Sequence, residues 1–217
     1  IWDGEHFVKS SHVFRFGVNA ILLFIRILTM SIVLASGSPR RSQLLADAGF
    51  TFTVIKPEVD ESFDAAIPVM DVPLIIANNK MAVAKTMCTA TDIIITADTV
   101  VVLEDTIIGK PTDREDAIRI LKALSGKMHT VVSGVCISQG TRQYDITVST
   151  KVYFDVLQET EIHYYLDKYQ PYDKAGAYAI QEWIGINKIT RIEGDYYNVV
   201  GFPMSKIFPV LSALLEQ

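Results

Sequence analysis

The feature that most constrains the fold is an uninterrupted apolar run, Ile93–Leu103, with the sequence IIITADTVVVL. A run of this kind predicts a central strand that is buried on both faces of a sheet. One carboxylate, Asp98, lies in its middle, flanked by Thr96 and Thr99. Burying an unpaired carboxylate is costly, so such a residue is retained where it meets a cation, a metal ion or a proton that it must move. The alternatives are a carboxylate that ends the strand and caps a turn, and a buried aspartate paired with arginine for structure alone.

A second stretch, Ser31–Gly49, predicts a strand, a tight turn and a helix. Ser38 is a suitable N-cap, and Pro39 stands at the first helical position, where proline is best tolerated. Arg40 and Arg41 then fall in the first helical turn, where the helix dipole is already positive. Free N–H groups, hydroxyls and two arginines at a helix start favour a phosphate site. The alternative is an ordinary capped surface helix with solvated arginines.

The remaining pattern alternates between strands and helices without a regular βαβ repeat. Strands are predicted at 51–55, 129–138, 143–155, 183–193 and 196–200, and helices at 71–89, 112–124, 159–169 and 204–215. An acidic loop at 56–62 and a turn at 109–111 separate some of these elements. This order predicts an α/β domain with a mixed sheet, and its irregularity favours a two-lobed fold over a plain doubly wound one.

Composition excludes several classes of protein. The formal net charge of −5 gives no bulk attraction to nucleic acid, so an anion site requires a local basic cluster. Cys88 and Cys136 show no CxxC spacing, which indicates free thiols in a reducing cytoplasm. The four histidines lack metal-ligand spacing, and no zinc site is predicted. Walker A, GxSxG and HExxH patterns are absent from the sequence, which argues against P-loop NTPases, serine hydrolases and zinc proteases.

The first 29 residues differ from the rest of the chain. The apolar run Phe16–Ile25 is too short to span a bilayer. We expect residues 1–29 to be an N-terminal extension and residues 30–217 to form the folded domain. The alternatives for the extension are the apolar part of a signal peptide and a peripheral membrane contact.

Pooling the candidates gives a set of cations with two carboxylates. The cations are Arg40, Arg41, Lys80, Lys110 and Lys174, and the carboxylates are Glu61 and Asp98. Several cations suit a polyphosphate, and carboxylates beside them suit a divalent metal or the activation of a water. Residue chemistry alone therefore predicts metal-assisted chemistry on a phosphorylated small molecule.

Five spaced motifs, in order from about Ser31 to the C-terminus, resemble the signature set of the Maf family of nucleoside triphosphate pyrophosphatases. They are Ser36-Gly37-Ser38-Pro39-Arg40-Arg41, Ala97-Asp98-Thr99, Gly109-Lys110-Pro111, Asp173-Lys174-Ala175-Gly176-Ala177-Tyr178 and Gly201-Phe202-Pro203. The resemblance implies a two-lobed α/β fold with a long mixed sheet and a central cleft, similar to inosine triphosphate pyrophosphatases. It also implies hydrolysis of a nucleoside triphosphate to the monophosphate and pyrophosphate, with Mg²⁺ or Mn²⁺.

The resemblance also implies roles for individual residues. Asp98 matches the proton acceptor, and Glu61 is expected to hold the metal together with Asp98. Ser38, Arg40, Arg41, Lys80 and Lys110 match phosphate-binding positions, and Arg40, Thr99 and Gln181 match positions associated with base selection.

Ala179-Ile180-Gln181 resembles the branch of the family that acts on dTTP and UTP. The resemblance therefore implies dTTP and UTP as substrates, with modified pyrimidine triphosphates as further candidates. Glu182 keeps open the branch that acts on 7-methyl-GTP, and a non-catalytic, nucleotide-binding regulator of cell division is the other alternative. We expect a cytoplasmic protein whose partner is a nucleotide, without a nucleic acid or a membrane. The sequence does not decide whether it forms a homodimer.

Overall fold

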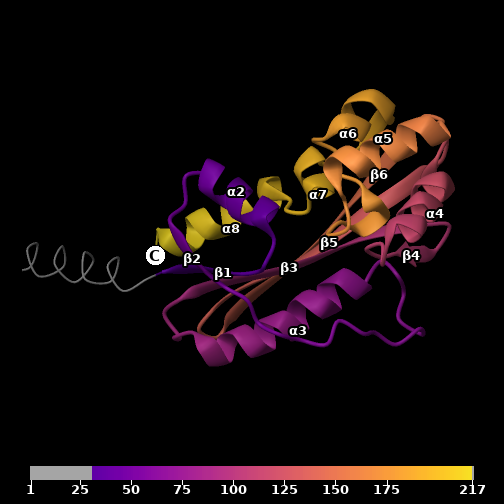
Figure 1. Cartoon of the computed structure of the whole chain (residues 1–217). Helices are drawn as coiled ribbons and strands as arrows, with labels where there is room; N and C mark the ends of the chain where they lie inside the picture. Colours follow the sequence, from indigo (N-terminus) through magenta and orange to yellow (C-terminus); the bar gives the residue numbers. More distant parts are fainter. Residues whose placement is uncertain (1–30, 217) are drawn as a thin grey trace, which may run out of the picture.

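The computed structural model describes residues 31–216, so the predicted extension at 1–29 lies outside the described residues. A seven-stranded mixed sheet runs through the molecule in the order β2-β1-β3-β5-β6-β7, with β4 paired to β3 (Figure 1). The strands are β1 (Ile32–Ala35), β2 (Phe52–Ile55), β3 (Ile93–Leu103), β4 (Thr106–Ile108), β5 (Met128–Gln139), β6 (Arg142–Phe154) and β7 (Ile189–Glu193). β1 is parallel to β2 and β3, whereas the other pairs are antiparallel. The predicted mixed α/β sheet is confirmed.

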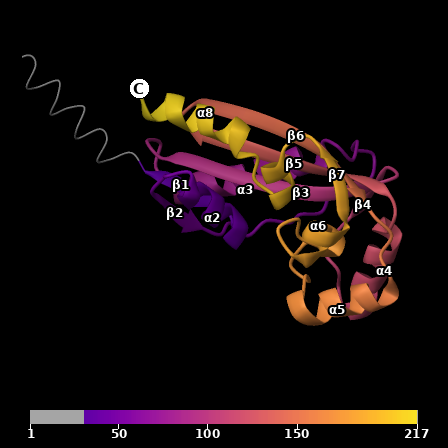
Figure 2. The same ribbon diagram turned by 90° about the horizontal axis from the view of Figure 1, so that it is seen from above.

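Helices cover both faces of this sheet. They are α2 (Pro39–Asp47), α3 (Val72–Met87), α4 (Arg114–Leu124), α5 (Glu159–Tyr169), α6 (Trp183–Lys188), α7 (Tyr196–Val200) and α8 (Met204–Leu215), with a short 3₁₀ turn, η1 (Ala175–Ala177). α3 lies against one face, while α2 and α8 cover one end of the other face and α4, α5 and α6 cover its far end (Figures 1 and 2). Across residues 31–216, no helix combines the length and the apolar character needed to cross a membrane.

Two groups of helices pack on the same face of β3: α2 with α8 at one end, and α4 with α5 and α6 at the other. Each group forms its own core, so the molecule has two lobes. Side chains alternate between the faces of a strand. Ile95 and Ala97 belong to the core formed with α2 and α8, and Val101 and Leu103 belong to the core formed with α4, α5 and α6. Ile94 faces α3 on the opposite side. The two cores part near the middle of β3, and the predicted two-lobed architecture is confirmed.

The C-terminal part of the sequence prediction is wrong at two elements. Residues 183–193 were expected to form one strand, but α6 occupies the first half and only Ile189–Glu193 is extended. Residues 196–200 were also expected to be a strand, but they form α7. The Asp195 side chain accepts hydrogen bonds from Tyr197 N and Asn198 N, and Gly201 ends the helix at φ 110°. These capping residues outweigh the β-propensity of the aromatic and β-branched residues between them. Strand β4 was not predicted, and the other elements are confirmed with small shifts at their ends.

Gly134 brings α3 directly onto the sheet. A Cβ atom at this position would lie 2.2 Å from Leu74 N and 2.4 Å from Pro73 C, both of which are backbone atoms of α3. Gly134 also pairs with Asp98 across β3 and β5. The glycine therefore sets how closely α3 approaches the strand that carries the buried carboxylate.

We predict that Gly134→Ala destabilises the protein by about 1–3 kcal/mol, the usual range for overpacking, because α3 must move away from β5. The loss corresponds to a fall in Tm of about 2–4 °C per kcal/mol for a chain of this size, measured by calorimetry. Gly109→Ala is the matched control, because a Cβ there meets nothing within 4 Å. Equal Tm values for the two variants would contradict the prediction.

His129 is a buried, neutral histidine on β5. Its Nε2 lies 2.7 Å from the Tyr178 hydroxyl, and its Nδ1 has no hydrogen-bond partner among residues 31–216. An imidazolium would need acceptors at both nitrogens. Burial lowers the pKa of His129 from 6.5 to about 4.

This shift makes stability depend on pH. The unfolded chain binds a proton near pH 6.5 and the folded chain only near pH 4, so the contribution is complete above 6.5 and is lost as the pH falls toward 4. We predict that His129→Gln reduces the slope of unfolding free energy against pH in this window by up to about 1.4 kcal/mol per pH unit, in denaturant titrations. Gln139→Ala, on the same strand and without a titratable side chain, is the control for this slope. A wild-type slope in His129→Gln would refute the assignment.

Candidate active site

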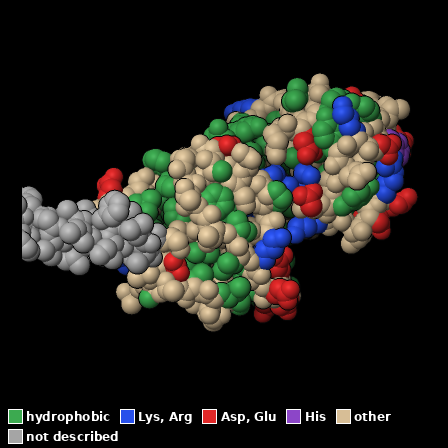
Figure 3. Space-filling view, turned by 60° about the vertical axis from the view of Figure 1, so that its left-hand side comes forward, with side chains coloured by type: hydrophobic (Ala, Val, Ile, Leu, Met, Phe, Trp, Pro, Cys, Tyr) green, Lys and Arg blue, Asp and Glu red, His purple; other side chains and the backbone are tan. Residues whose placement is uncertain are grey.

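A cavity of about 600 Å³ lies where the two helical groups part. This volume is in the range of small-molecule sites. One wall comes from the loop after β1 and the start of α2, and the opposite wall comes from the segment before α6, including Tyr178, Ala179 and Gln181. Lysine, arginine and acidic side chains gather in the middle of this side of the molecule, between its two ends (Figure 3).

The cavity opens beside a gap in the sheet. β1 pairs with β3 only as far as Ile95, and β4 pairs with it only from Val101 onward. Between these points Thr96–Val100 has β5 as its strand partner on one side and no strand on the other. Asp98 lies in this stretch. The gap therefore lets a residue of a central strand line an open cavity.

Asp98 is paired with Lys80 of α3. Lys80 Nζ lies 2.8 Å from Asp98 Oδ1 and 2.6 Å from Glu61 Oε1, so one ammonium joins both carboxylates. The side chains of Lys80 and Asp98 are 13% and 15% exposed, and that of Glu61 is 49% exposed. Thr96 anchors the same helix, because its hydroxyl donates to Ala77 O at 2.8 Å. The cluster keeps one negative charge in excess, which suits a base or a metal ligand.

The pKa of Glu61 reflects these partners. Partial burial by itself raises it, but the hydrogen bond and charge of Lys80, with smaller contributions from Lys110 and Arg41, hold the pKa below its ordinary value. Glu61 therefore stays ionised beside the cavity.

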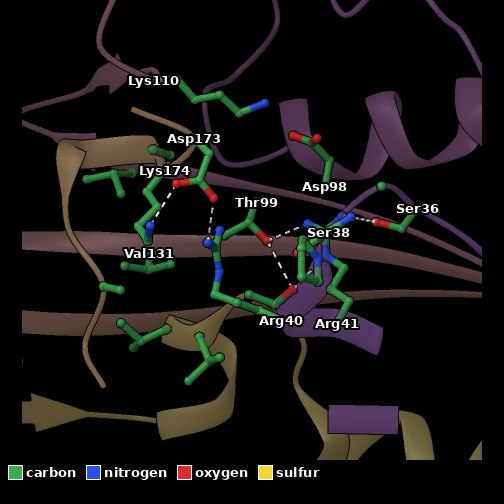
Figure 4. Close-up of a pocket in the computed structure, with 18 of the residues that line it drawn as sticks. Ser36, Ser38, Arg40, Arg41, Asp98, Thr99, Lys110, Val131, Asp173 and Lys174 are labelled. Atoms are coloured by element: carbon green, nitrogen blue, oxygen red, sulfur yellow. Dashed lines mark hydrogen bonds and ion pairs between the residues drawn. The ribbon is translucent and has the colours of Figure 1, made fainter. Parts of the chain in front are cut away.

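Arg40 reaches across the cavity to the opposite wall. Its Nη1 donates to Asp173 Oδ2 at 3.0 Å, and Lys174 Nζ donates to Asp173 Oδ1 at 2.7 Å (Figure 4). Partial burial raises the pKa of Asp173, but the two cations outweigh it and lower the pKa overall. The pair links α2 with the segment that follows α5.

Arg41 and Thr99 are held mainly by the protein. Arg41 donates to Ser36 Oγ, Ala97 O, Thr99 Oγ1 and Gly201 O at 2.8–3.1 Å. The Thr99 hydroxyl also lies 2.8 Å from Ser133 Oγ. Both residues line the cavity, but their polar groups already have partners.

The other predicted residues also line the cavity. Ser38 occupies the N-cap position of α2, but its side chain makes no capping bond. Lys110 follows β4, and its ammonium points into the cavity (Figure 4). Gln181 lies on the opposite wall. The structure thus brings all ten predicted residues to the lining of one cavity: Ser38, Arg40, Arg41, Glu61, Lys80, Asp98, Thr99, Lys110, Lys174 and Gln181.

Sequence analysis missed Lys56 as a cavity residue. It follows β2, and its side chain lies beside Gly37. Because β1 and β2 are parallel, their carboxyl ends meet at the same edge of the sheet. The position of Lys56 directly after a strand parallel to β1 was the signal that could have identified it.

Glu61 and Asp98 fit a divalent metal as a pair of carboxylate ligands. In residues 31–216, no group of three or more histidine, cysteine, aspartate or glutamate side chains is arranged to hold a metal ion. Mg²⁺ is commonly held by one or two carboxylates together with substrate phosphates and water, and two carboxylates that share one lysine match that donor set.

Comparisons with known proteins show which family the chain belongs to. Residues 31–214 match the family model described as "Maf-like protein". A protein named dTTP/UTP pyrophosphatase from Bacteroides thetaiotaomicron is 44% identical over 84% of this chain and 95% of its own length. Another protein of that name, from Porphyromonas gingivalis W83, is 46% identical over 82% of this chain and 90% of its own length.

Among solved structures, a nucleoside-triphosphatase (dITP/XTP pyrophosphatase) from Mycobacterium abscessus aligns with 58% of this chain and 74% of its own. Its TM-score is 0.37 at 15% identity, a similarity that by itself assigns neither fold nor function. The match of the family model over residues 31–214, together with relatives that align over most of their length, decides the family. The chain belongs to the Maf family.

Proposed function

We propose that this protein hydrolyses dTTP and UTP to the nucleoside monophosphate and pyrophosphate. The observation that carries the proposal is the Asp98–Lys80–Glu61 cluster at the edge of a cationic cavity. The relatives named dTTP/UTP pyrophosphatase supply the reaction and the substrate class.

Asp98 is proposed to be the general base. Oδ1 accepts from Lys80, whereas Oδ2 has no hydrogen bond among the residues that the structure describes. Oδ2 is therefore free to take a proton from a water. The water oxygen attacks the α-phosphorus, the bond between the α-phosphorus and the α–β bridging oxygen breaks, and its electrons leave with pyrophosphate.

The cations around the cavity are proposed to bind the triphosphate. Arg40, Lys80 and Lys110, with the hydroxyl of Ser38, lie where they oppose the repulsion between an anionic substrate and an attacking oxygen. Lys80 has three N–H donors and uses two on Glu61 and Asp98, so one is left for a phosphate oxygen. Arg41 is not assigned to the phosphates, because its donors are mostly used within the protein.

Glu61 and Asp98 are the residues that would hold Mg²⁺ or Mn²⁺. Such an ion, when bound, neutralises charge on the phosphates and lowers the pKa of a bound water. The protein's own contribution is to hold both carboxylates close together through Lys80, whose charge also lowers the pKa of Glu61.

Arg40 and Gln181 are proposed to select the base by direct contact, and Thr99, whose hydroxyl already bonds with Arg41 and Ser133, is proposed to shape the cavity beside them. Glu182, the reason for considering 7-methyl-GTP, accepts a hydrogen bond from the Tyr165 hydroxyl and lies 3.6 Å from Lys174 Nζ. The Glu182 carboxylate is therefore engaged by Tyr165 and Lys174, and Glu182 does not line the cavity, whereas its neighbour Gln181 does. This favours a pyrimidine nucleotide over 7-methyl-GTP.

We predict that Asp98→Asn lowers kcat for dTTP by about 10²–10⁴-fold, the usual contribution of a general base. The dissociation constant of dTTP, measured by calorimetry, should change little, because asparagine has nearly the same size as aspartate and the cations remain. Asp167→Asn, which alters a surface ion pair with Arg114, is the matched control. Full activity in Asp98→Asn would reject this mechanism, and tight dTTP binding without turnover in the wild type would favour the non-catalytic regulator.

We predict that dTTP and UTP outcompete 7-methyl-GTP when the nucleotides are mixed; pyrophosphate release and chromatography of the products measure the outcome.

Gln181→Ala should reduce kcat/KM for dTTP by about 10–100-fold, because an amide hydrogen bond to the base is lost, while inhibition by pyrophosphate is unchanged. Gln43→Ala, whose amide pairs with Asp47 in α2, serves as the control. Preferential hydrolysis of 7-methyl-GTP would overturn the choice of base.

A further inference from the structure

We propose that Arg41 is a positioning residue: its guanidinium takes the place of a missing neighbouring strand and holds β3 at Asp98. This assignment replaces the expected phosphate contact of Arg41. It rests on the proposed function only for what Asp98 does, since the contacts of Arg41 are independent of the reaction.

The gap in the sheet creates the need for such a residue. Ala97 lies between the end of the β1 pairing and the start of the β4 pairing. On the edge of β3 that faces this gap, no strand among residues 31–216 supplies an N–H group to its carbonyl oxygen. A buried backbone carbonyl without a partner is costly. Arg41 Nη1 donates to Ala97 O at 2.8 Å and supplies the missing bond.

The other bonds of Arg41 join the segments that surround the cavity. Nη2 donates to Thr99 Oγ1 at 3.1 Å, so Arg41 holds the residues on both sides of Asp98. Nη1 also donates to Ser36 Oγ at 3.1 Å, and Nε donates to Gly201 O at 3.0 Å. One side chain thereby connects β3 with the loop after β1 and the loop before α8 (Figure 4).

These bonds leave Arg41 poorly equipped to grip a phosphate. A guanidinium has five N–H donors, and four hydrogen bonds to the protein leave one. Bidentate binding of a phosphate needs two parallel donors. Arg40 differs, because its one hydrogen bond within residues 31–216 is the bond from Nη1 to Asp173. The two adjacent arginines therefore have different roles: Arg40 faces the ligand, and Arg41 connects the segments that surround Asp98.

Lysine cannot replace Arg41 in this role. Its donors radiate from one nitrogen atom, whereas the four acceptors surround a planar fork. Arg41→Lys therefore keeps the positive charge and removes the bridging geometry, which makes it the informative variant.

The experiment compares Arg41→Lys, Arg40→Lys and the wild type by hydrogen–deuterium exchange and by kinetics on the full chain. Arg41→Lys should speed exchange in peptides that cover 96–100 by about tenfold or more, because this stretch opens locally more often. It should lower kcat for dTTP by about 10–100-fold and leave inhibition by inorganic pyrophosphate within about threefold of the wild type. Arg40→Lys should instead weaken inhibition by pyrophosphate and leave exchange at 96–100 unchanged. Arg114→Lys, at a surface ion pair, is the control for both readouts.

Unchanged exchange at 96–100 in Arg41→Lys would overturn the proposal, and so would a loss of pyrophosphate inhibition as large as that in Arg40→Lys with kcat retained. If Arg41→Lys fails to fold, Ser36→Ala removes one acceptor of Arg41, together with the longer bond that Ser38 N donates to the same hydroxyl, and should still speed exchange at 96–100, by a smaller factor. If the wild type turns over no nucleotide, the proposed function fails, while the exchange result still decides the role of Arg41.

Discussion

The ion pair between Asp98 and Lys80 is the interaction on which the site depends. A carboxylate in the middle of a central strand loses most of its hydration, and only a close cation makes that position tolerable. Lys80 lies 2.8 Å away because α3 packs directly onto β5 at Gly134, the residue paired with Asp98. The charge of the site and the packing of the helix therefore depend on each other.

The gap between β1 and β4 is the second requirement. A complete sheet would bury Asp98 among strands, whereas the gap gives it access to the cavity while β5 still pairs with the other side of β3. The gap leaves backbone groups without strand partners, and Arg41 supplies bonds to this stretch from α2. The gap gives a substrate access to Asp98, and Arg41 keeps this part of β3 ordered despite the gap.

Much of the fold could be predicted from local patterns. The apolar run Ile93–Leu103 is the central strand, and the turn at 36–38 leads into a helix as expected. The failures lie at 183–188 and 196–200, where apolar and aromatic residues suggested strands but helices form. Asp195 and Gly201 cap the second helix, and these two capping residues carry more information than the propensity of the residues between them.

The sequence by itself determined the chemistry that is available: a carboxylate in an apolar strand, arginines at a helix start and lysines in spaced motifs. Tertiary structure decided which of these groups keep donors and acceptors for a ligand. Arg40 and Arg41 are neighbours of the same type, yet Arg41 makes four hydrogen bonds to the protein and Arg40 makes one. Likewise Gln181 lines the cavity while Glu182 turns to Tyr165 and Lys174. The physical reason is that a side chain's partners come from segments distant in sequence, and no local pattern specifies where those segments meet.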